Sequence, residues 1–277
     1  MAVLNVTPDS FSDGGSIATP ADAVRAARAA ADAGADLLDI GGESTRPGAG
    51  AVPEAEQIAR VAPAIRAVRE AGLDAPITVD TTRAAVARAA LDAGADAVND
   101  VSAGLDDPAM LPLIARRRVG VVLMHRRSAP ARDRYSDRYV AEPDYGPAGV
   151  VRAVRDFLAE RLGAARDAGV APDSIAVDPG LGFGKSVGQN FELLASIDRL
   201  VTLGAPVLVG ASRKSFLGAV TGEADPARRL SESIAAAVAA RLGGASIVRA
   251  HDAGPHRRAL AAADAVRAAR MGRVWPG

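Results

Sequence analysis

Apolar and polar positions alternate along the chain in one repeated rhythm, in which short runs rich in Val, Ile and Leu are separated by longer segments of helical period. The runs predict β-strands over residues 2–6, 36–41, 76–80, 97–101, 119–124, 174–178, 206–211 and 246–250. The segments between them predict helices near 20–33, 53–71, 83–93, 107–117, 146–168, 189–203, 226–242 and 255–270. Eight strands alternating with eight helices predict an α/β fold, a single (β/α)8 TIM barrel, with an open, doubly wound sheet as the alternative.

Short signals mark where individual helices start and stop. The string TPAD at 19–22 predicts a helix start with a capping side chain, a proline in the first turn and a reciprocal acid. Pro63 lies within a helical pattern, so we expect a kink or a break there. The string DAGAD at 32–36 and again at 92–96 places Gly at two helix-to-strand junctions, where it suits a left-handed cap. No linker divides the chain, so we expect one domain over residues 1–277.

Composition narrows the classes of protein that fit. The 277 residues are 49% apolar and 24% charged, as in an ordinary globular protein, and 33 basic residues balance 33 acidic ones. The balance argues against nucleic acid or a membrane as a partner, and no run approaches the roughly 18 apolar residues of a membrane span. The chain has no Cys, which excludes disulfides, thiolate nucleophiles and Cys zinc sites. The opening MAVLNVTPDS lacks the features of a secretion signal, so we expect a cytoplasmic protein.

Polar residues gather where the predicted strands end. The runs finish on Asn5, Asp39, Asp80, Asn99, His125, Asp178, Ser212 and Arg249. In a barrel of this kind all eight strand ends face one mouth, which carries the chemistry. Ordinary polarity at strand exits is the alternative explanation, but eight polar ends in register favour a functional site.

The residue types at the predicted mouth suit two kinds of ligand group. Acceptors suited to a flat heterocycle with several N–H donors follow three strands, at Asp80, Asn99 and Asp178. Cations suited to an anion such as phosphate follow other strands, at Arg46, Lys214, Arg249 and His251. Structural carboxylates and solvated loop cations are the alternatives for any one of these residues. The string GLGFGKS at 180–186 has neither the Walker nor the dinucleotide spacing, so we reject nucleotide sites of those kinds.

Six strings of the chain resemble the dihydropteroate synthases of bacterial folate synthesis. They are NVTPDSFSDGG at 5–15, DIGGESTRPGA at 39–49, VDTTRAAVARAALDAGADAVNDVS at 79–102, DPGLGFGKS at 178–186, GASRKSFLG at 210–218 and VRAHD at 248–252. They run in order over nearly the whole chain and fall on successive predicted barrel loops. The resemblance implies a transferase that joins 6-hydroxymethyl-7,8-dihydropterin diphosphate to 4-aminobenzoate, giving 7,8-dihydropteroate and diphosphate.

The resemblance also implies roles for individual residues. Those matched to the pterin edge are Asp80, Asn99, Asp178 and Lys214, and those matched to the diphosphate are Asn5, Thr45, Arg249 and His251. Those matched to the 4-aminobenzoate pocket are Phe11, Arg46, Pro47, Phe183 and Ser215, although ordinary core packing is an alternative for Phe183. The implied catalytic residues are Lys214, Arg249 and His251. Two loops, Asp9–Asp13 and Ser44–Pro47, are expected to close over the site.

The implied reaction requires charge stabilisation rather than a strong base. Loss of diphosphate leaves a cation on the pterin methylene, and the aromatic amine that attacks it is already neutral at pH 7. Mg2+ is the expected cofactor, contacted by Asn5, and it would help the basic residues to stabilise the departing negative charge. Two rival functions stay open: a methyltetrahydrofolate-dependent corrinoid methyltransferase, which needs no diphosphate site, and a non-catalytic pterin-binding paralogue, which would lose the leaving-group residues.

Some features of the chain lie outside the matched strings. The family usually carries an extension before the first strand, so either the start is shortened here or that end of the barrel is closed differently. The segment 126–145 is longer and more charged than the usual loop after the fifth strand, and the motifs give it no role. The resemblance and the Ala-rich stretch Ser231–Leu242 lead us to expect a homodimer. Sulfonamides, which mimic the aminobenzoate, are the expected inhibitors.

Overall fold

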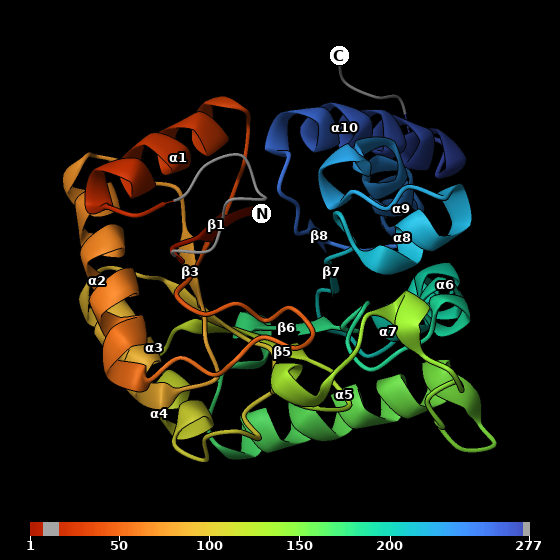
Figure 1. Ribbon diagram of the computed structural model, residues 1–277, viewed down its shortest axis with the longest axis horizontal. Coiled ribbons are helices and arrows are strands. Elements are labelled where there is room, and N and C mark those ends of the chain that lie inside the picture. Colours follow the sequence, from red (N-terminus) through yellow and green to blue (C-terminus); the bar gives the residue numbers. More distant parts are fainter. Residues whose placement is uncertain (8–16, 274–277) are drawn as a thin grey trace.

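The computed structural model describes residues 1–7 and 17–273, and it places eight short parallel strands inside a ring of helices (Figure 1). The strands are β1 (Ala2–Asn5), β2 (Leu38–Gly41), β3 (Ile77–Asp80), β4 (Ala97–Asp100), β5 (Gly120–Met124), β6 (Ile175–Asp178), β7 (Leu208–Val209) and β8 (Ile247–Val248). Each strand lies within one of the predicted apolar runs, so these predictions are confirmed.

Hydrogen bonds connect the strands into a closed circle. Strands β1 to β6 pair in sequence order, and β7 pairs with β8. Isolated parallel bridges join Val177 to Val207 and Ala2 to Ala250, which link β6 to the start of β7 and the end of β8 to β1. The circle confirms the predicted barrel and excludes the doubly wound alternative, because an open sheet would leave two edges unpaired.

The helices follow the predicted order, with two departures. They are α1 (Pro20–Asp32), α2 (Glu54–Glu70), α3 (Ala84–Asp92), α4 (Met110–Arg117), α5 (Gly149–Asp167), α6 (Val187–Ala195), α7 (Ile197–Val201), α8 (Ser215–Thr221), α9 (Leu230–Leu242) and α10 (Ala253–Arg270). The helix expected over 189–203 divides at Ser196 into α6 and α7. The sequence predicted no helix for the segment that forms α8, which is too short to show a helical period. No helix in the described part of the chain combines the length and the apolar character that a membrane span requires.

The break expected at Pro63 is wrong, because α2 continues through this residue. Its ring lies on the exposed face of the helix, while Val61, Ala64 and Ile65 on the other face are buried in the core. The carbonyl that a proline leaves without an amide partner is tolerated most easily on the solvent side. Packing of the apolar face therefore holds the two halves of α2 together.

The local signals at helix ends are confirmed. The Thr19 hydroxyl accepts a hydrogen bond from the Asp22 amide at 3.2 Å, and the Asp22 carboxylate accepts one from the Thr19 amide at 2.9 Å. The Gly of each DAGAD string is left-handed, with φ of +88° at Gly34 and +110° at Gly94. These residues end α1 and α3 and turn the chain into the next strand.

Alternation along the strands separates two apolar layers. One face of each strand packs against the helices, where residues such as Ile40, Ile77 and Val98 are fully buried. The other face points into the barrel, where a smaller cluster contains Val122, Ala176, Leu208, Met1 and Ile247. Because side chains alternate with a period of two, this inward face continues two residues later with Met124, Asp178, Gly210 and Arg249. The strand pleat therefore brings these strand ends to one cavity.

Arg69, near the end of α2, ties the opposite end of the barrel together. Its side chain is only 24% exposed, and it forms an ion pair with Asp96. The guanidinium donates hydrogen bonds to the carbonyls of Gly94, Leu73 and Ala75 at 2.9, 2.8 and 2.9 Å. One cation thus satisfies three carbonyls in the loops that lead into β3 and β4.

We expect Arg69→Met to lower the free energy of unfolding by about 2–3 kcal/mol, because it leaves these partly buried carbonyls without their donor. Urea unfolding followed by circular dichroism measures this change. Arg66→Met is the matched control, since Arg66 lies exposed on the same helix. Equal effects of the two substitutions would contradict the role of Arg69.

Candidate active site

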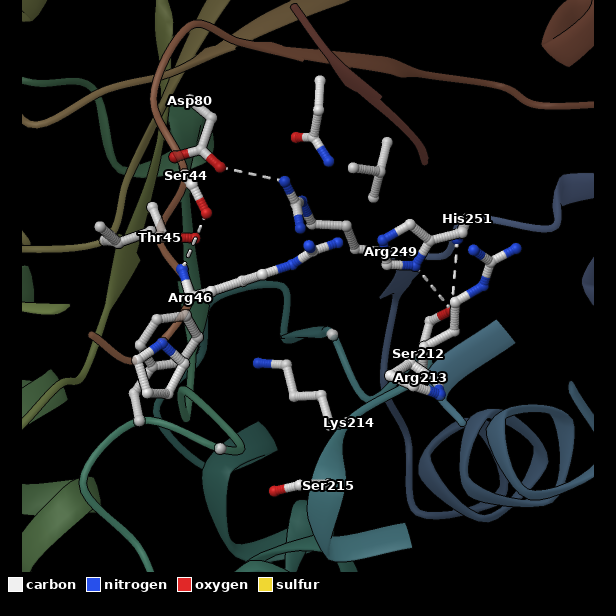
Figure 2. Close-up of a pocket in the computed structure, with 18 of the residues that line it drawn as sticks. Ser44, Thr45, Arg46, Asp80, Ser212, Arg213, Lys214, Ser215, Arg249 and His251 are labelled. Atoms are coloured by element: carbon white, nitrogen blue, oxygen red, sulfur yellow. Dashed lines mark hydrogen bonds and ion pairs between the residues drawn. The ribbon is translucent and has the colours of Figure 1, made fainter. Parts of the chain in front are cut away.

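A cavity of about 260 Å3 lies at the carboxyl ends of the barrel strands (Figure 2). The predicted site residues that line it are Asn5, Thr45, Arg46, Pro47, Asp80, Asn99, Asp178, Phe183, Lys214, Ser215, Arg249 and His251. Phe11 and the first predicted loop, Asp9–Asp13, lie outside the described residues. The structure therefore brings together every predicted site residue that it describes, from segments spread over the whole chain.

The inner end of the cavity is organised around Arg249, which lies just after β8. Its Nε donates to the Asp39 carboxylate at 2.6 Å, and its Nη2 donates to the Asp80 carboxylate at 3.0 Å. Asp39 is completely buried, and Asp80 is 6% exposed. One guanidinium thus pairs with two carboxylates and joins β8 to β2 and β3 across the barrel.

Asp39 is a functional residue to which the sequence assigned no role. Besides Arg249, its carboxylate accepts hydrogen bonds from the Thr78 hydroxyl at 2.5 Å and from the Asn99 side-chain amide at 3.0 Å. It therefore fixes the orientation of Asn99, one of the predicted pterin residues. The signal in the sequence was an acid inside an otherwise apolar strand, where only a buried partner makes a carboxylate tolerable.

One oxygen of the Asp80 carboxyl group accepts no hydrogen bond from the described residues. Burial raises the pKa of its carboxyl to about 7, the Asp39 carboxylate adds to the rise, and Arg249 opposes it. Among the described residues, its Oδ1 is buried and has no hydrogen-bond partner. An N–H donor on a ligand would satisfy this oxygen and favour the ionised form.

Asp178, at the end of β6, completes the acceptor set. Its Oδ1 accepts from the Gly180 amide at 2.6 Å, and burial raises the pKa of its carboxyl. Asp178 is 5% exposed, as deep as Asp80, and it lines the same cavity. The two carboxylates and Asn99 therefore form a polar surface suited to a flat ring with N–H donors.

Lys214 and Phe183 contact each other and both line the cavity. The Lys214 ammonium lies 4.2 Å from the centre of the Phe183 ring and donates to the Leu181 carbonyl. Burial lowers the pKa of Lys214 to about 8. Gly182 permits this contact, because a Cβ there would lie 2.7 Å from the Lys214 Cδ. Phe183 is thus part of the cavity wall, and core packing is not its main role.

The loop that carries Phe183 is held from behind by Lys185, which the sequence analysis missed. Lys185 is completely buried, and its ammonium donates to the carbonyls of Gly180 and Phe183, both at 2.8 Å. It also lies 3.0 Å from His125 Nδ1. Burial, with Lys185 next in importance, lowers the pKa of His125 to about 2, so the imidazole is neutral and its Nδ1 accepts from Lys185. His125 therefore has a structural role, although it ends a strand.

The backbone before Lys214 is constrained in a conformation that few side chains adopt. Arg213 has φ of +63°, in the left-handed region. Its amide donates to the Ser233 hydroxyl at 2.9 Å, its carbonyl accepts from Arg229 at 3.0 Å, and its guanidinium pairs with Asp252 at 2.9 Å. These contacts with α9 and the start of α10 orient Lys214 and Ser215 toward the cavity.

Cationic groups converge on the remaining side. Figure 2 shows Arg46 directing its charged end toward Arg249 and His251, whereas the Lys214 ammonium points away from them, toward Phe183. His251 Nδ1 lies 3.0 Å from the Ser212 hydroxyl, which fixes the imidazole. This grouping can attract an anion such as diphosphate.

The residues at the cavity offer little to a metal ion by themselves. In residues 1–7 and 17–273, no three carboxylate or imidazole side chains cluster in a way that would hold one. Asn5 contributes a single neutral oxygen at the end of β1. An oxygen of this kind fits a Mg2+ whose other ligands come from diphosphate and water, but it does not make a site on its own.

Comparisons with known proteins agree with this geometry. A family model described as pterin binding enzyme matches residues 1–251. The chain is 42% identical to the dihydropteroate synthase of Synechocystis sp., over 96% of this chain and 89% of that protein. It is 50% identical to the probable bifunctional folylpolyglutamate synthase/dihydropteroate synthase of Haloferax volcanii, over 91% of this chain but only 28% of that protein. The chain thus spans less than a third of the length of that bifunctional relative.

A solved structure has the same fold and carries one of the expected substrates. It is the dihydropteroate synthase of Xanthomonas albilineans with 4-aminobenzoic acid, which superposes with a TM-score of 0.85 at 45% sequence identity. The superposition covers 97% of this chain and 92% of that one.

The raised pKa of Asp80 predicts how stability changes with pH. The folded protein holds a proton on this carboxyl up to about pH 7, whereas the unfolded chain loses it near pH 4, so this group's contribution to stability falls as pH rises from about 4 to 7. Asp80→Asn should remove that decline, on the order of 4 kcal/mol at most for three pKa units. Urea unfolding at pH 5, 6, 7 and 8 measures the difference from the original chain, with exposed Asp74→Asn as control. Parallel curves for the Asp80 variant and the original chain would contradict the shift.

Proposed function

The chain belongs to the pterin-binding enzyme family, and from that premise we propose that it condenses 6-hydroxymethyl-7,8-dihydropterin diphosphate with 4-aminobenzoate to give 7,8-dihydropteroate and diphosphate in folate biosynthesis. The observation that carries the proposal is that one cavity collects the described residues predicted for both substrates and for the leaving group. A corrinoid methyltransferase would have no use for a diphosphate site. A non-catalytic paralogue would not need the leaving-group residues Thr45, Arg249 and His251, which all line the cavity.

The buried acceptors bind the first substrate through its pterin ring. The amino-pyrimidine edge presents N–H donors, which match the free Oδ1 of Asp80 and the Asp178 carboxylate. When an N–H group of the ring donates to Asp80, the carboxyl group favours its ionised form, because a carboxylate that accepts a hydrogen bond is stabilised. The ring is thereby held with its methylene toward the cationic side of the cavity.

The chemical step breaks the C–O bond between the pterin methylene and diphosphate. The electron-rich ring delocalises the positive charge on the methylene, and the amine nitrogen of 4-aminobenzoate attacks that carbon and then loses a proton to water. Thr45 and His251 face the departing diphosphate. Arg249 uses its Nε and Nη2 for Asp39 and Asp80, which leaves Nη1 free of hydrogen bonds to the described residues and available to diphosphate. A good contact of this sort contributes on the order of 3 kcal/mol to the transition state.

The second substrate occupies the aromatic side of the cavity. Phe183 and Pro47 supply apolar surface for its ring, and Arg46, Lys214 and Ser215 supply positive charge and a hydroxyl for its carboxylate. The Lys214 pKa of about 8 keeps most of the ammonium charged at neutral pH. Asn5 would contact a Mg2+ carried by the diphosphate, and such an ion neutralises charge on the leaving group.

The direct test is an assay with purified protein, both substrates and Mg2+, in which dihydropteroate is measured. Product should form, and removal of Mg2+ by EDTA should stop turnover while binding of a pterin without diphosphate is kept. Absence of product under these conditions, with intact pterin binding, would favour the non-catalytic alternative. Methyl transfer from methyltetrahydrofolate to a corrinoid would favour the methyltransferase.

Asp178→Asn should weaken pterin binding by about 100-fold or more. The Gly180 amide would hold the new side-chain oxygen, so the NH2 group would face the ring's donors. Calorimetric titration with a pterin measures the affinity. Asp173→Asn, an exposed acid just before β6, is the control. An unchanged affinity of the Asp178 variant would remove this residue from the site.

We also propose that the protein is a homodimer, as the family resemblance implies. Support comes from α9 and α10, which pack together and leave Val266 46% exposed and Met271, just past α10, 57% exposed. Light scattering at micromolar concentration should give twice the chain mass of 28.1 kDa. A monomer mass would reject the proposal.

A further inference from the structure

The segment 126–145, which the motifs left without a role, is fixed against three loops that carry predicted aminobenzoate residues. It contains two short 3-10 turns, Pro130–Arg132 and Ser136–Arg138. Its contacts with the other loops are Gly48 N to Pro130 O at 2.8 Å, Gly184 N to Asp133 Oδ2 at 2.9 Å and Ser136 N to Ser215 Oγ at 3.1 Å. The partners lie next to Pro47 and Phe183, or are Ser215 itself. The segment therefore closes one side of the cavity.

Two of its three tyrosines hold the segment in place. The Tyr139 hydroxyl donates to Asp133 at 2.6 Å, and the Tyr145 hydroxyl donates to the Gly184 carbonyl at 2.8 Å. Tyr135 differs, because it lines the cavity and none of the hydrogen bonds between the described residues involves its hydroxyl. At 45% exposure it stands at the rim, whereas Asp80 is 6% exposed at the inner end.

The neighbouring residue orients the group that faces the second substrate. Because the Ser136 amide donates to the Ser215 oxygen, the Ser215 hydroxyl hydrogen is left to donate elsewhere. The Ser136 hydroxyl is itself held by Asn190 at 2.9 Å. A carboxylate on the second substrate could accept the Ser215 hydrogen, and Tyr135, next to Ser136 in the chain, lines the same cavity as Ser215.

We propose that Tyr135 is a specificity-determining residue for the second substrate. Its ring forms the outer wall of the aminobenzoate end of the cavity, contacts the aromatic acid and limits how far the substituent opposite the amine can extend. The inference rests on the proposed condensation. It assigns the cavity a preference for free 4-aminobenzoates over 4-aminobenzoyl amides of amino acids.

The experiment compares Tyr135→Ala, Tyr135→Phe and the original chain with 4-aminobenzoate and with 4-aminohippurate, its glycine amide. In Tyr135→Ala the KM for 4-aminobenzoate should rise about 5-fold, because an aromatic contact is lost. The KM for the pterin diphosphate should stay within about 2-fold. The ratio of kcat/KM for 4-aminohippurate over 4-aminobenzoate should rise about 10-fold or more, because the wall is removed.

Two controls separate the wall from general damage to the segment. Tyr135→Phe keeps the ring and should behave as the original chain. Val140→Ala changes a side chain that is 98% exposed on the same segment and should also leave every constant unchanged. An unchanged substrate ratio in Tyr135→Ala, or a parallel rise in both KM values, would overturn the proposal. If the original chain makes no product from 4-aminobenzoate, the condensation itself fails and the assignment of Tyr135 falls with it.

Discussion

The sharing of Arg249 between two buried carboxylates is the interaction on which the cavity depends. The guanidinium joins the strand end of β8 to Asp39 on β2 and Asp80 on β3, and Asp39 in turn fixes Asn99 on β4. Loss of the Arg249 cation would leave two buried acids without a compensating charge. The free-energy cost of that loss is far larger than the net stabilisation that the ion pairs themselves contribute. Burial, with the Asp39 carboxylate next in importance, raises the pKa of Asp80 to about 7, and its buried Oδ1 is left to accept an N–H donor from a ligand.

The glycine-rich loop after β6 shows that small residues can serve packing as much as ligand binding. A Cβ on Gly180 would lie 1.9 Å from the His125 carbonyl oxygen, so only glycine allows the two backbone segments to approach this closely. Lys185 fills the space behind it and holds two of its carbonyls. These contacts fix the loop that carries Phe183, so this part of the cavity wall is held in place by packing behind it.

Much of the fold and part of the site follow from the sequence because they depend on local periodicity. The strand runs, the caps at Thr19 and Gly34 and the ring of polar strand ends require only a chain that alternates with a period of two or 3.6. The parallel barrel then places the ends of all strands at one mouth, so Asp80, Asn99, Asp178 and Arg249 meet without further information. The prediction of a break at Pro63 was wrong, because the free-energy cost of a proline within a helix depends on which face of the helix it occupies.

By itself the sequence determined the order of the elements and the chemistry available at the strand ends. The tertiary structure alone decided which of those groups pair with one another, because partners such as Arg249 and Asp39 are far apart in the chain and meet only across the closed barrel. It also decided that His125 and Lys185 are buried away from the cavity, and that Tyr135 reaches it from a segment without a motif. Periodicity fixes the face on which a side chain lies, whereas partners and depth depend on how distant segments pack.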